Sequence, residues 1–272
     1  MPWQPTRLVR QVRTLDTSMG TTEWKTDATF GFVKALGNRQ GPHALASELV
    51  ATSLAAWFDL TVAEYAVLDL PADACYDLPH GARTEPGPAF VSRKMDGRTW
   101  GGAEEDLTTL GNPADITRLV VCDTWVRNCD RHPPDLTARR PNLANVFLKY
   151  ADKSDRLVLT AIDHTHCFDG GSDWSPKLDH IDRWRDDRTY GLFPAFARFL
   201  QIDTLPWCAA HLRTLTGPIV DAILNRIPVD WQVSLGVQSA LANLILRRAT
   251  YLADRIENGW WPANPTTEES QL

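Results

Sequence analysis

The 272-residue sequence has no long apolar run, no excess of positive charge and few cysteines. No window reaches about 18 uninterrupted apolar residues, and the basic N-terminus has no signal-peptide core, so we expect no membrane partner. The net charge of −6 argues against a general nucleic-acid binder, because phosphate neutralisation needs a basic face, so we expect no nucleic acid as a partner. The five cysteines are odd in number and form no C-x-x-C pair, which favours reduced thiols and a cytoplasmic location.

Glycine-rich phosphate-binding motifs are also missing, since the chain contains neither G-x-G-x-x-G nor the Walker pattern before its strands. We expect the stretch DTSMGTTEWKTDAT, residues 16–29, to be a loop that holds one glycine, Gly20. Ser18 and Thr21 beside it can offer hydroxyl and backbone N–H groups to a phosphate. A plain hairpin turn is the alternative, and it stays open.

The order of apolar patterns predicts an α+β chain of two lobes. Residues 1–96 read as a small β-rich lobe with one main helix, and residues 97–262 as a larger helical lobe with an embedded β-hairpin. The turn-rich stretch DGRTWGG, residues 96–102, marks a hinge between them, and 263–272 form a polar tail. Strands are predicted at 8–15, 30–37, 61–70, 88–95, 145–150 and 156–163, and helices at 42–60, at 113–128 and in a bundle at 193–257.

Lys34 stands in line with apolar residues on the strand 30–37. Because side chains alternate across a strand, Phe30, Phe32 and Lys34 share one side. A lysine there either reaches solvent from the edge or has a partner in a cleft. Glu48, on the next helix, has small, mainly apolar neighbours three and four residues away, where an unpaired carboxylate is very unfavourable. Lys34 is the obvious cation for it, and such a pair positions nucleotide phosphates in protein kinases.

Asp130, Asn145 and Asp163 follow at the ends of later elements. Asn145 opens the first hairpin strand and Asp163 closes the second, so hairpin geometry can bring them to the same end, near Asp130. Carboxylate and amide oxygens suit Mg²⁺ with phosphates, and one carboxylate is left to accept a hydroxyl proton. Singly, Asp130 could be a turn residue and Asp163 a strand cap. Their order after the Lys and the Glu favours a phosphotransfer site.

A pool of soft metal ligands in the same region suggests a rival, a metal-dependent phosphohydrolase. Zinc sites usually show a tight pair such as C-x-x-C or H-E-x-x-H, and this region has none. We therefore expect these side chains to orient loops by hydrogen bonds. The residues are Cys129, His132, His164, His166 and Cys167.

With these motifs in view, the chain resembles the HipA-like kinases, in the compact form without the N-terminal extension. It is also similar to the catalytic core of phosphatidylinositol 3/4-kinases, which share the D-R-H-x-x-N form of catalytic loop. The resemblance covers about residues 15 to 260 and implies a protein-kinase-like fold. The matching pieces are FVKALG, SELVATSLA, DTWVRNCDRH, NVFL and IDHTHCF.

The resemblance implies a role for each matching residue. Asp130 corresponds to the catalytic base, Asn145 and Asp163 to the magnesium ligands, and Lys34, positioned by Glu48, to the residue that binds the ATP phosphates. The strand FVSRKM would contact adenine through backbone groups, at Val91, Ser92 and Lys94, and the loop with Ser18, Gly20 and Thr21 would cover the phosphates. Family members often carry a phosphorylatable serine in that loop, which makes Ser18 a candidate autophosphorylation site.

The chain departs from the family pattern in one spacing. The pattern places the asparagine five residues after the catalytic aspartate, whereas Asn145 is fifteen after Asp130, and Asn142 competes for the role. Asn145 directly precedes a strand, which is where the hairpin geometry requires the metal-binding asparagine to be. The intervening PPDLTARRPN, residues 133–142, must then loop out and return. It is either a passive surface loop or an element at the mouth of the site whose Arg139 and Arg140 face the acceptor or the phosphate.

We therefore expect an ATP- and Mg²⁺-dependent kinase that transfers the γ-phosphate to a hydroxyl, with Ser/Thr of a protein as the acceptor that the resemblance implies. The alternatives are a nucleotide-binding pseudokinase or interaction module and the metal phosphohydrolase. Kinship alone suggests a toxin–antitoxin context, with an antitoxin or regulatory partner. A lipid acceptor is disfavoured, because the chain has no polybasic patch.

Overall fold

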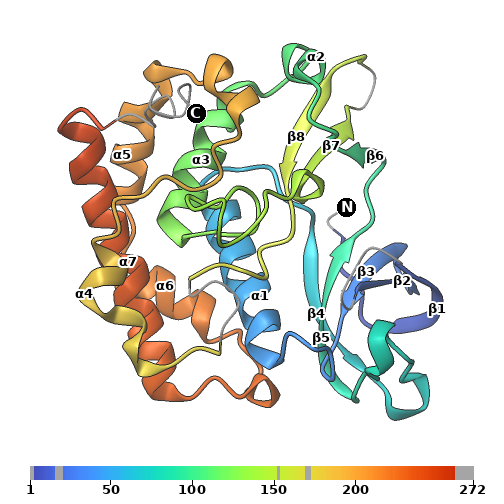
Figure 1. The fold of residues 1–272 in the computed structure, drawn as a ribbon. Helices are drawn as coiled ribbons and strands as arrows, with labels where there is room; N and C mark the ends of the chain where they lie inside the picture. Colours follow the sequence, from blue (N-terminus) through green and yellow to red (C-terminus); the bar gives the residue numbers. More distant parts are fainter. Residues whose placement is uncertain (1–2, 16–20, 152–153, 169–172, 261–272) are drawn as a thin grey trace.

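The computed structural model describes residues 3–15, 21–151, 154–168 and 173–260 (Figure 1). Its N-terminal part is an antiparallel sheet in the order β1-β2-β3-β5-β4. Two 3₁₀ turns, Ala72–Ala74 and Pro79–Gly81, lie between β4 and β5. The strands are β1 Leu8–Thr14, β2 Thr21–Thr26, β3 Phe30–Lys34, β4 Tyr65–Leu70 and β5 Gly87–Arg93.

The C-terminal part joins a small antiparallel sheet, in the order β6-β7-β8, to most of the helices. The mixed α+β class, with a β-rich N-terminal sheet and a helical C-terminal region, is confirmed. The strands are β6 Gly97–Thr99, β7 Val146–Tyr150 and β8 Leu157–Ala161. The helices are α1 Pro42–Trp57 in the N-terminal part, then α2 Glu104–Thr108, α3 Ala114–Val126, α4 Ile181–Trp184, α5 Leu205–Arg213, α6 Gly217–Leu224 and α7 Leu235–Glu257.

Three local predictions need correction. The expected loop 16–29 contains β2, whose Thr and Trp residues suit a strand that pairs with β1 on one side and β3 on the other. The expected hinge 96–102 contains β6, which pairs with β7. The stretch 193–202 begins with the 3₁₀ segment Pro194–Phe199 in place of a helix. The change from one sheet to the other falls at the expected hinge, but the lobe boundaries stay a prediction.

The two faces of β3 meet different parts of the molecule, as its alternation predicts. Val33 is buried with Trp24 and Leu68 in a cluster behind the N-terminal sheet. Phe32 and Lys34 point the other way and line a cleft. The strand's period of two thus separates a core face from a face available to a ligand.

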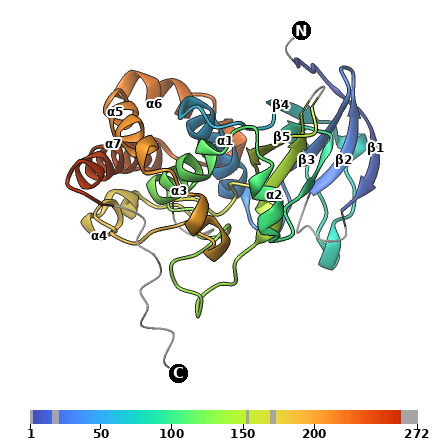
Figure 2. The same ribbon diagram turned by 90° about the horizontal axis from the view of Figure 1, so that it is seen from above.

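Helix α1 lies between the N-terminal sheet and the C-terminal helices (Figures 1 and 2). It begins at Pro42, which suits a first helical turn because proline lacks an N–H group. Residues 44–55 are all buried, since the helix contacts β5 on one side and α6 and the 3₁₀ turn Val229–Trp231 on the other. A polar side chain on α1, such as Glu48, must therefore find its partners inside the protein.

Candidate active site

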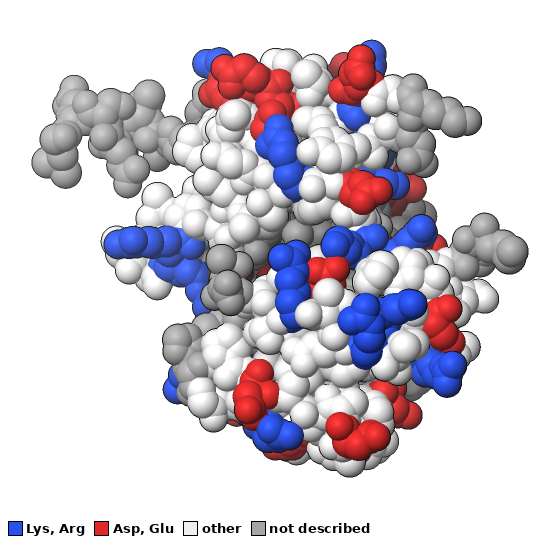
Figure 3. Space-filling view, turned by 90° about the vertical axis from the view of Figure 1, so that its right-hand side faces the viewer, with Lys and Arg blue, Asp and Glu red and all other residues white. Residues whose placement is uncertain are grey.

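A cleft of about 550 Å³ lies between the N-terminal sheet and the β7–β8 hairpin. On the face shown in Figure 3 the molecule is hollowed between its two halves, and Lys and Arg side chains gather along the hollow. One part of the cleft lining is apolar and the other is polar. The apolar residues include Phe32, Ala63, Phe90, Phe147 and Ile162, and the polar ones include Lys34, Glu48, Asp130, Asn145 and Asp163.

Lys34 forms the expected pair with Glu48 and also binds Asp163. Its Nζ atom donates to Oε2 of Glu48 at 2.7 Å and to Oδ1 of Asp163 at 2.8 Å. Burial opposes the charge on Lys34, but the two carboxylates outweigh this effect and raise the pKa of the amine above its ordinary value. Lys34 is therefore a fixed cation that joins β3, α1 and the segment after β8.

Thr165 completes this cluster and was not predicted from the sequence. Its hydroxyl lies 2.9 Å from Oε2 of Glu48 and 2.8 Å from Oδ1 of Asp163, and it accepts from Lys34 at 2.9 Å. The Glu48 carboxylate also accepts from the backbone N–H of His164 at 3.2 Å. The available signal was a hydroxyl residue two positions after Asp163, but its orientation depends on a turn that periodicity does not reveal.

Asp163 occupies that turn. Its φ of 57° lies in the left-handed region, which Asp tolerates better than most residues. The turn leaves 37% of the side chain exposed at the cleft, although Lys34 holds one oxygen. Burial would raise the pKa of Asp163, but Lys34, helped by Thr165, lowers it well below the ordinary value. The carboxylate is thus charged and accessible.

Asp130 and Asn145 meet in spite of the long insertion. Nδ2 of Asn145 donates to Oδ2 of Asp130 at 2.7 Å, and Nδ2 of Asn142 donates to Oδ1 of Asn145 at 2.9 Å. Asn142 also accepts from the backbone of Ala144 as the cap of a 3₁₀ turn, Leu143–Asn145. Asn142 Nδ2 also reaches the same Asp130 oxygen, at 3.5 Å, so Asn145 is the closer partner of Asp130 and Asn142 supports it.

The insertion closes on itself. The backbone N–H of Asn142 donates to the carbonyl of Arg131 at 2.9 Å, so the two ends of the loop meet. Within the loop, Asp135 accepts from the N–H and the hydroxyl of Thr137 at 2.9 and 2.6 Å. Because the loop ends are joined, the extra length does not move Asn145 away from Asp130. The loop also returns Arg139 to Asp130, at 3.0 Å between Nη1 and Oδ1.

A buried ion pair fixes the backbone beneath these residues. The fully buried Arg131 donates from Nε to Asp123 at 2.7 Å and from Nη1 to the carbonyls of Asn145 and Ile162. Asn128 donates to the same Asp123 carboxylate at 3.1 Å. One guanidinium thus connects the loop of Asp130 with the residue preceding Asp163, which sets their spacing.

Of the residues predicted to contact the nucleotide, some line the cleft and others do not. Ser92 and Thr21 line the cleft. Val91 is fully buried in the cluster behind the sheet. Lys94 donates its backbone N–H to Phe30 and its amine to Glu23 at 2.7 Å, and it is not among the described residues that line the cleft. Ser18 and Gly20 lie outside the described residues.

The soft ligands that suggested a phosphohydrolase do not converge. His164 is buried against Thr52, and desolvation lowers the pKa of its imidazole to about 3. His132 packs edge-on against Phe193 at 5.2 Å, and the Cys129 thiol donates to the carbonyl of His166. Across the part of the chain that the structure describes, no group of three or more His, Cys, Asp or Glu could hold a metal ion.

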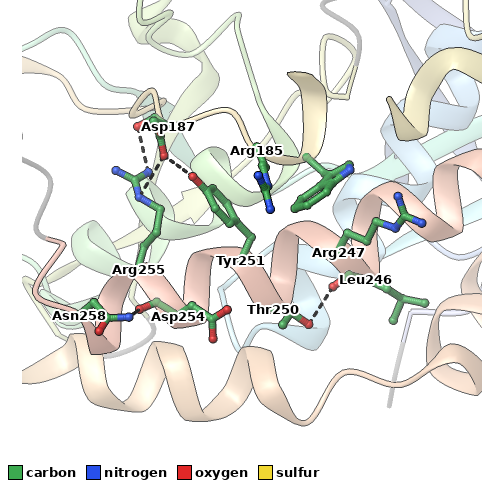
Figure 4. Close-up of a pocket in the computed structure, with 10 residues that line it drawn as sticks. Arg185, Asp187, Leu246, Arg247, Thr250, Tyr251, Asp254, Arg255 and Asn258 are labelled. Carbon is green, nitrogen blue, oxygen red and sulfur yellow. Dashed lines mark hydrogen bonds and ion pairs between the residues drawn. The ribbon is translucent and has the colours of Figure 1, made fainter. Parts of the chain in front are cut away.

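A second groove, of about 890 Å³, lies over α7 and the end of α4 (Figure 4). Its carboxylates already have partners: Asp187 accepts from Tyr251 and pairs with Arg255, and Asp254 pairs with Arg213. Among the described residues that line this groove there is no lysine held between two carboxylates, as Lys34 is in the cleft. The cleft with Lys34 is therefore the better candidate for chemistry.

The chain is similar to known kinases in sequence and in structure. A family model described as HipA-like kinase matches residues 25–263. A Helicobacter pylori proinflammatory kinase, CtkA, is similar in structure, with a TM-score of 0.55 and 14% identity over 93% of this chain and 97% of that one. The PknI kinase domain of Mycobacterium tuberculosis, in a point-mutant form, also matches, with 13% identity over 92% of this chain and 94% of that one. Its TM-score of 0.28 is too low to indicate a shared fold.

No curated protein matches the chain significantly. Among the described residues there is no helix with the length and apolarity of a membrane span. The CtkA likeness, at 14% identity, shows a kinase fold and nothing finer. The family match covers most of the sequence, so the chain belongs to the HipA-like kinase family.

Proposed function

We propose that this kinase transfers the γ-phosphate of ATP to a hydroxyl group, with Asp130 as the base. The observation that carries the proposal is the double pairing of Lys34 with Glu48 and Asp163, at 2.7 and 2.8 Å, in a cleft that Asp130 and Asn145 also line. A fixed cation beside carboxylate and amide oxygens is what a nucleoside triphosphate with its metal requires.

Asn145 and Asp163 would hold Mg²⁺. They fit it because both offer oxygen atoms at the cleft, and Asp163 is charged and 37% exposed on its side chain. Mg²⁺ would neutralise the phosphates and orient them. Lys34 would bind a phosphate, with Glu48 fixing its amine.

Asp130 would orient the acceptor hydroxyl and take its proton as the new oxygen–phosphorus bond forms and the bond to ADP breaks. The Asn145 contact at 2.7 Å fixes one Asp130 oxygen, so the carboxylate orientation is set before the acceptor arrives. The apolar part of the cleft, with Phe32 and Phe90, suits an adenine ring, and Ser92 lies beside it.

Protein Ser/Thr is the acceptor that we propose from the family. Lobe boundaries at residues 96 and 262, autophosphorylation at Ser18, a cytoplasmic location and an antitoxin or regulatory partner stay predictions.

The test is transfer of label from γ-labelled ATP with Mg²⁺, to the protein itself and to a mixture of proteins. We expect transfer by the wild type and a loss of at least about 10³-fold in Asp130→Ala and Asp163→Asn. Asp182→Ala is the matched control, since its side chain is 84% exposed. Nucleotide binding without any transfer would overturn the kinase proposal and leave a pseudokinase.

A further inference from the structure

The insertion after Asp130 places the guanidinium of Arg139 next to that aspartate. Arg139 Nη1 lies 3.0 Å from Oδ1 of Asp130, while Asn145 binds the other oxygen at 2.7 Å. The Arg139 side chain is 32% exposed, so part of the guanidinium is available to a ligand. Arg139 is thus the insertion's cationic contact with the proposed base.

The site has more carboxylates than cations, which favours a further positive charge there. Three carboxylates, Glu48, Asp130 and Asp163, line the cleft, and two of them already bind Lys34. Arg93, the arginine among the described residues that line the cleft, is paired with Glu64, and Arg139 meets the lining through Asp130. A triphosphate would bring further negative charge next to Asp130. Without a cation beside it, the Asp130 carboxylate would repel the phosphoryl group as this group moves towards the acceptor.

Arg131 cannot supply this charge. It is fully buried, its Nε atom donates to Asp123, and its Nη1 atom donates to two backbone carbonyls. Arg139 differs because it reaches Asp130 from the surface side and still has N–H donors on a planar guanidinium that can bind phosphate oxygens.

We propose that Arg139 is a catalytic residue of this kinase that binds the transferred phosphoryl group while remaining next to Asp130. The inference rests on the proposed function. The insertion is then the element that brings the cation to the phosphate, and its joined ends, Arg131 and Asn142, keep Arg139 within reach.

The experiment compares Arg139→Ala, Arg139→Lys and Arg140→Ala. Arg140 is the matched control, because it is adjacent and exposed and no contact ties it to Asp130. Transfer rates are measured at saturating Mg·ATP, nucleotide affinity by titration, and folding by thermal melting.

We expect Arg139→Ala to lower the rate by about 10²- to 10³-fold. Its nucleotide affinity and melting temperature should stay close to those of the wild type. Arg139→Lys should recover part of the rate, and Arg140→Ala should stay within about twofold of the wild type.

The outcomes separate the two proposals. A wild type that binds nucleotide and transfers nothing overturns the kinase proposal and this inference with it. An active wild type with an equally active or faster Arg139→Ala overturns the inference alone, and so does a loss explained entirely by weaker nucleotide binding. If Arg139→Ala does not fold, the rate of a folded Arg139→Lys decides: a rate below that of the wild type at unchanged nucleotide affinity supports the inference, and a rate equal to that of the wild type, as an uninvolved residue would give, opposes it.

Discussion

Lys34 and Glu48 are fourteen residues apart in the sequence, and their side chains meet at 2.7 Å between β3 and α1. Because the Glu48 side chain is only 5% exposed, the pair is also a structural contact. The same lysine binds Asp163, so the site and the packing of α1 depend on one amine.

Replacing Lys34 by Met should leave both carboxylates without their cation. We expect the free energy of unfolding to fall by about 3 kcal/mol, as for a broken buried ion pair, and phosphate transfer to fall by at least about 10²-fold. Denaturant unfolding and the label-transfer assay measure the two effects.

The double variant Lys34→Met with Glu48→Gln is the control for stability. It removes one stranded charge, so it should be more stable than Lys34→Met alone and still inactive. Strictly additive losses of stability would contradict a coupled pair.

This pair was predictable because both signals are local. The alternation of β3 places Lys34 on the cleft side, and the helical spacing around Glu48 leaves a carboxylate among small apolar neighbours. The order of Asp130, Asn145 and Asp163 was likewise visible as a motif. Each of these signals depends on neighbours in the sequence or on a fixed order.

Other features depend on tertiary structure and were missed. The contact of Arg139 with Asp130 requires a loop path that a stretch such as PPDLTARRPN does not specify, although its arginines and its place at the site were noted. Strand β2 was read as loop because Thr, Ser, Asp and Gly dominate its surroundings, and its pairing on both sides overrides that composition. Thr165 was not predicted because its contacts depend on the turn at Asp163, which the periodicity of the sequence does not reveal.

The choice between Asn145 and Asn142 can be tested through magnesium. We expect Asn145→Ala to raise the Mg²⁺ concentration needed for half-maximal transfer by at least about tenfold, because it removes a proposed ligand. Asn142→Ala should raise it by less than about threefold, since Asn142 binds Asn145 at 2.9 Å and its own contact with Asp130 is longer, at 3.5 Å. The reverse ranking would assign the ligand role to Asn142.

Asp186 should make the stability of the protein depend on pH in the acid range. It accepts from Arg127 at 3.0 Å, from Arg188 at 2.8 Å and from Tyr190 at 2.7 Å. Burial would raise the pKa of Asp186, but the hydrogen bonds from Arg188 and Tyr190, together with the Arg127 charge, lower it well below the ordinary value. Arg127 ends α3 just before the loop of Asp130, so this carboxylate also anchors that loop.

As the pH falls, the unfolded chain takes up the proton first, near the ordinary Asp pKa of about 4. The stabilisation by Asp186 is therefore complete above that pH and is lost progressively below it. Asp186→Asn should cost about 2 kcal/mol at pH 7 and flatten the acid side of the stability profile. Asp221→Asn, at an exposed site, is the control, and an unchanged acid slope in Asp186→Asn would refute the assignment.

Gly191 packs directly against the carboxylate of the buried Asp123–Arg131 pair. A Cβ atom at Gly191 would lie 2.3 Å from Oδ2 and 2.7 Å from Cβ of Asp123, and the backbone φ of +75° already disfavours other residues. We expect Gly191→Ala to displace Asp123, to lower the free energy of unfolding by more than about 2 kcal/mol and to reduce transfer, because Arg131 would lose its position under Asn145.

Gly236, near the start of α7, is the matched glycine, because nothing lies within 4 Å of its added Cβ. Gly236→Ala should leave transfer unchanged and stabilise the protein by up to about 1 kcal/mol through helix propensity. Stability and rate, measured on both variants, separate a loss of the Asp123–Arg131 contact from a general cost of replacing glycine. A Gly191→Ala protein as stable and as active as Gly236→Ala would mean that the buried pair does not set the spacing between Asp130 and Asp163.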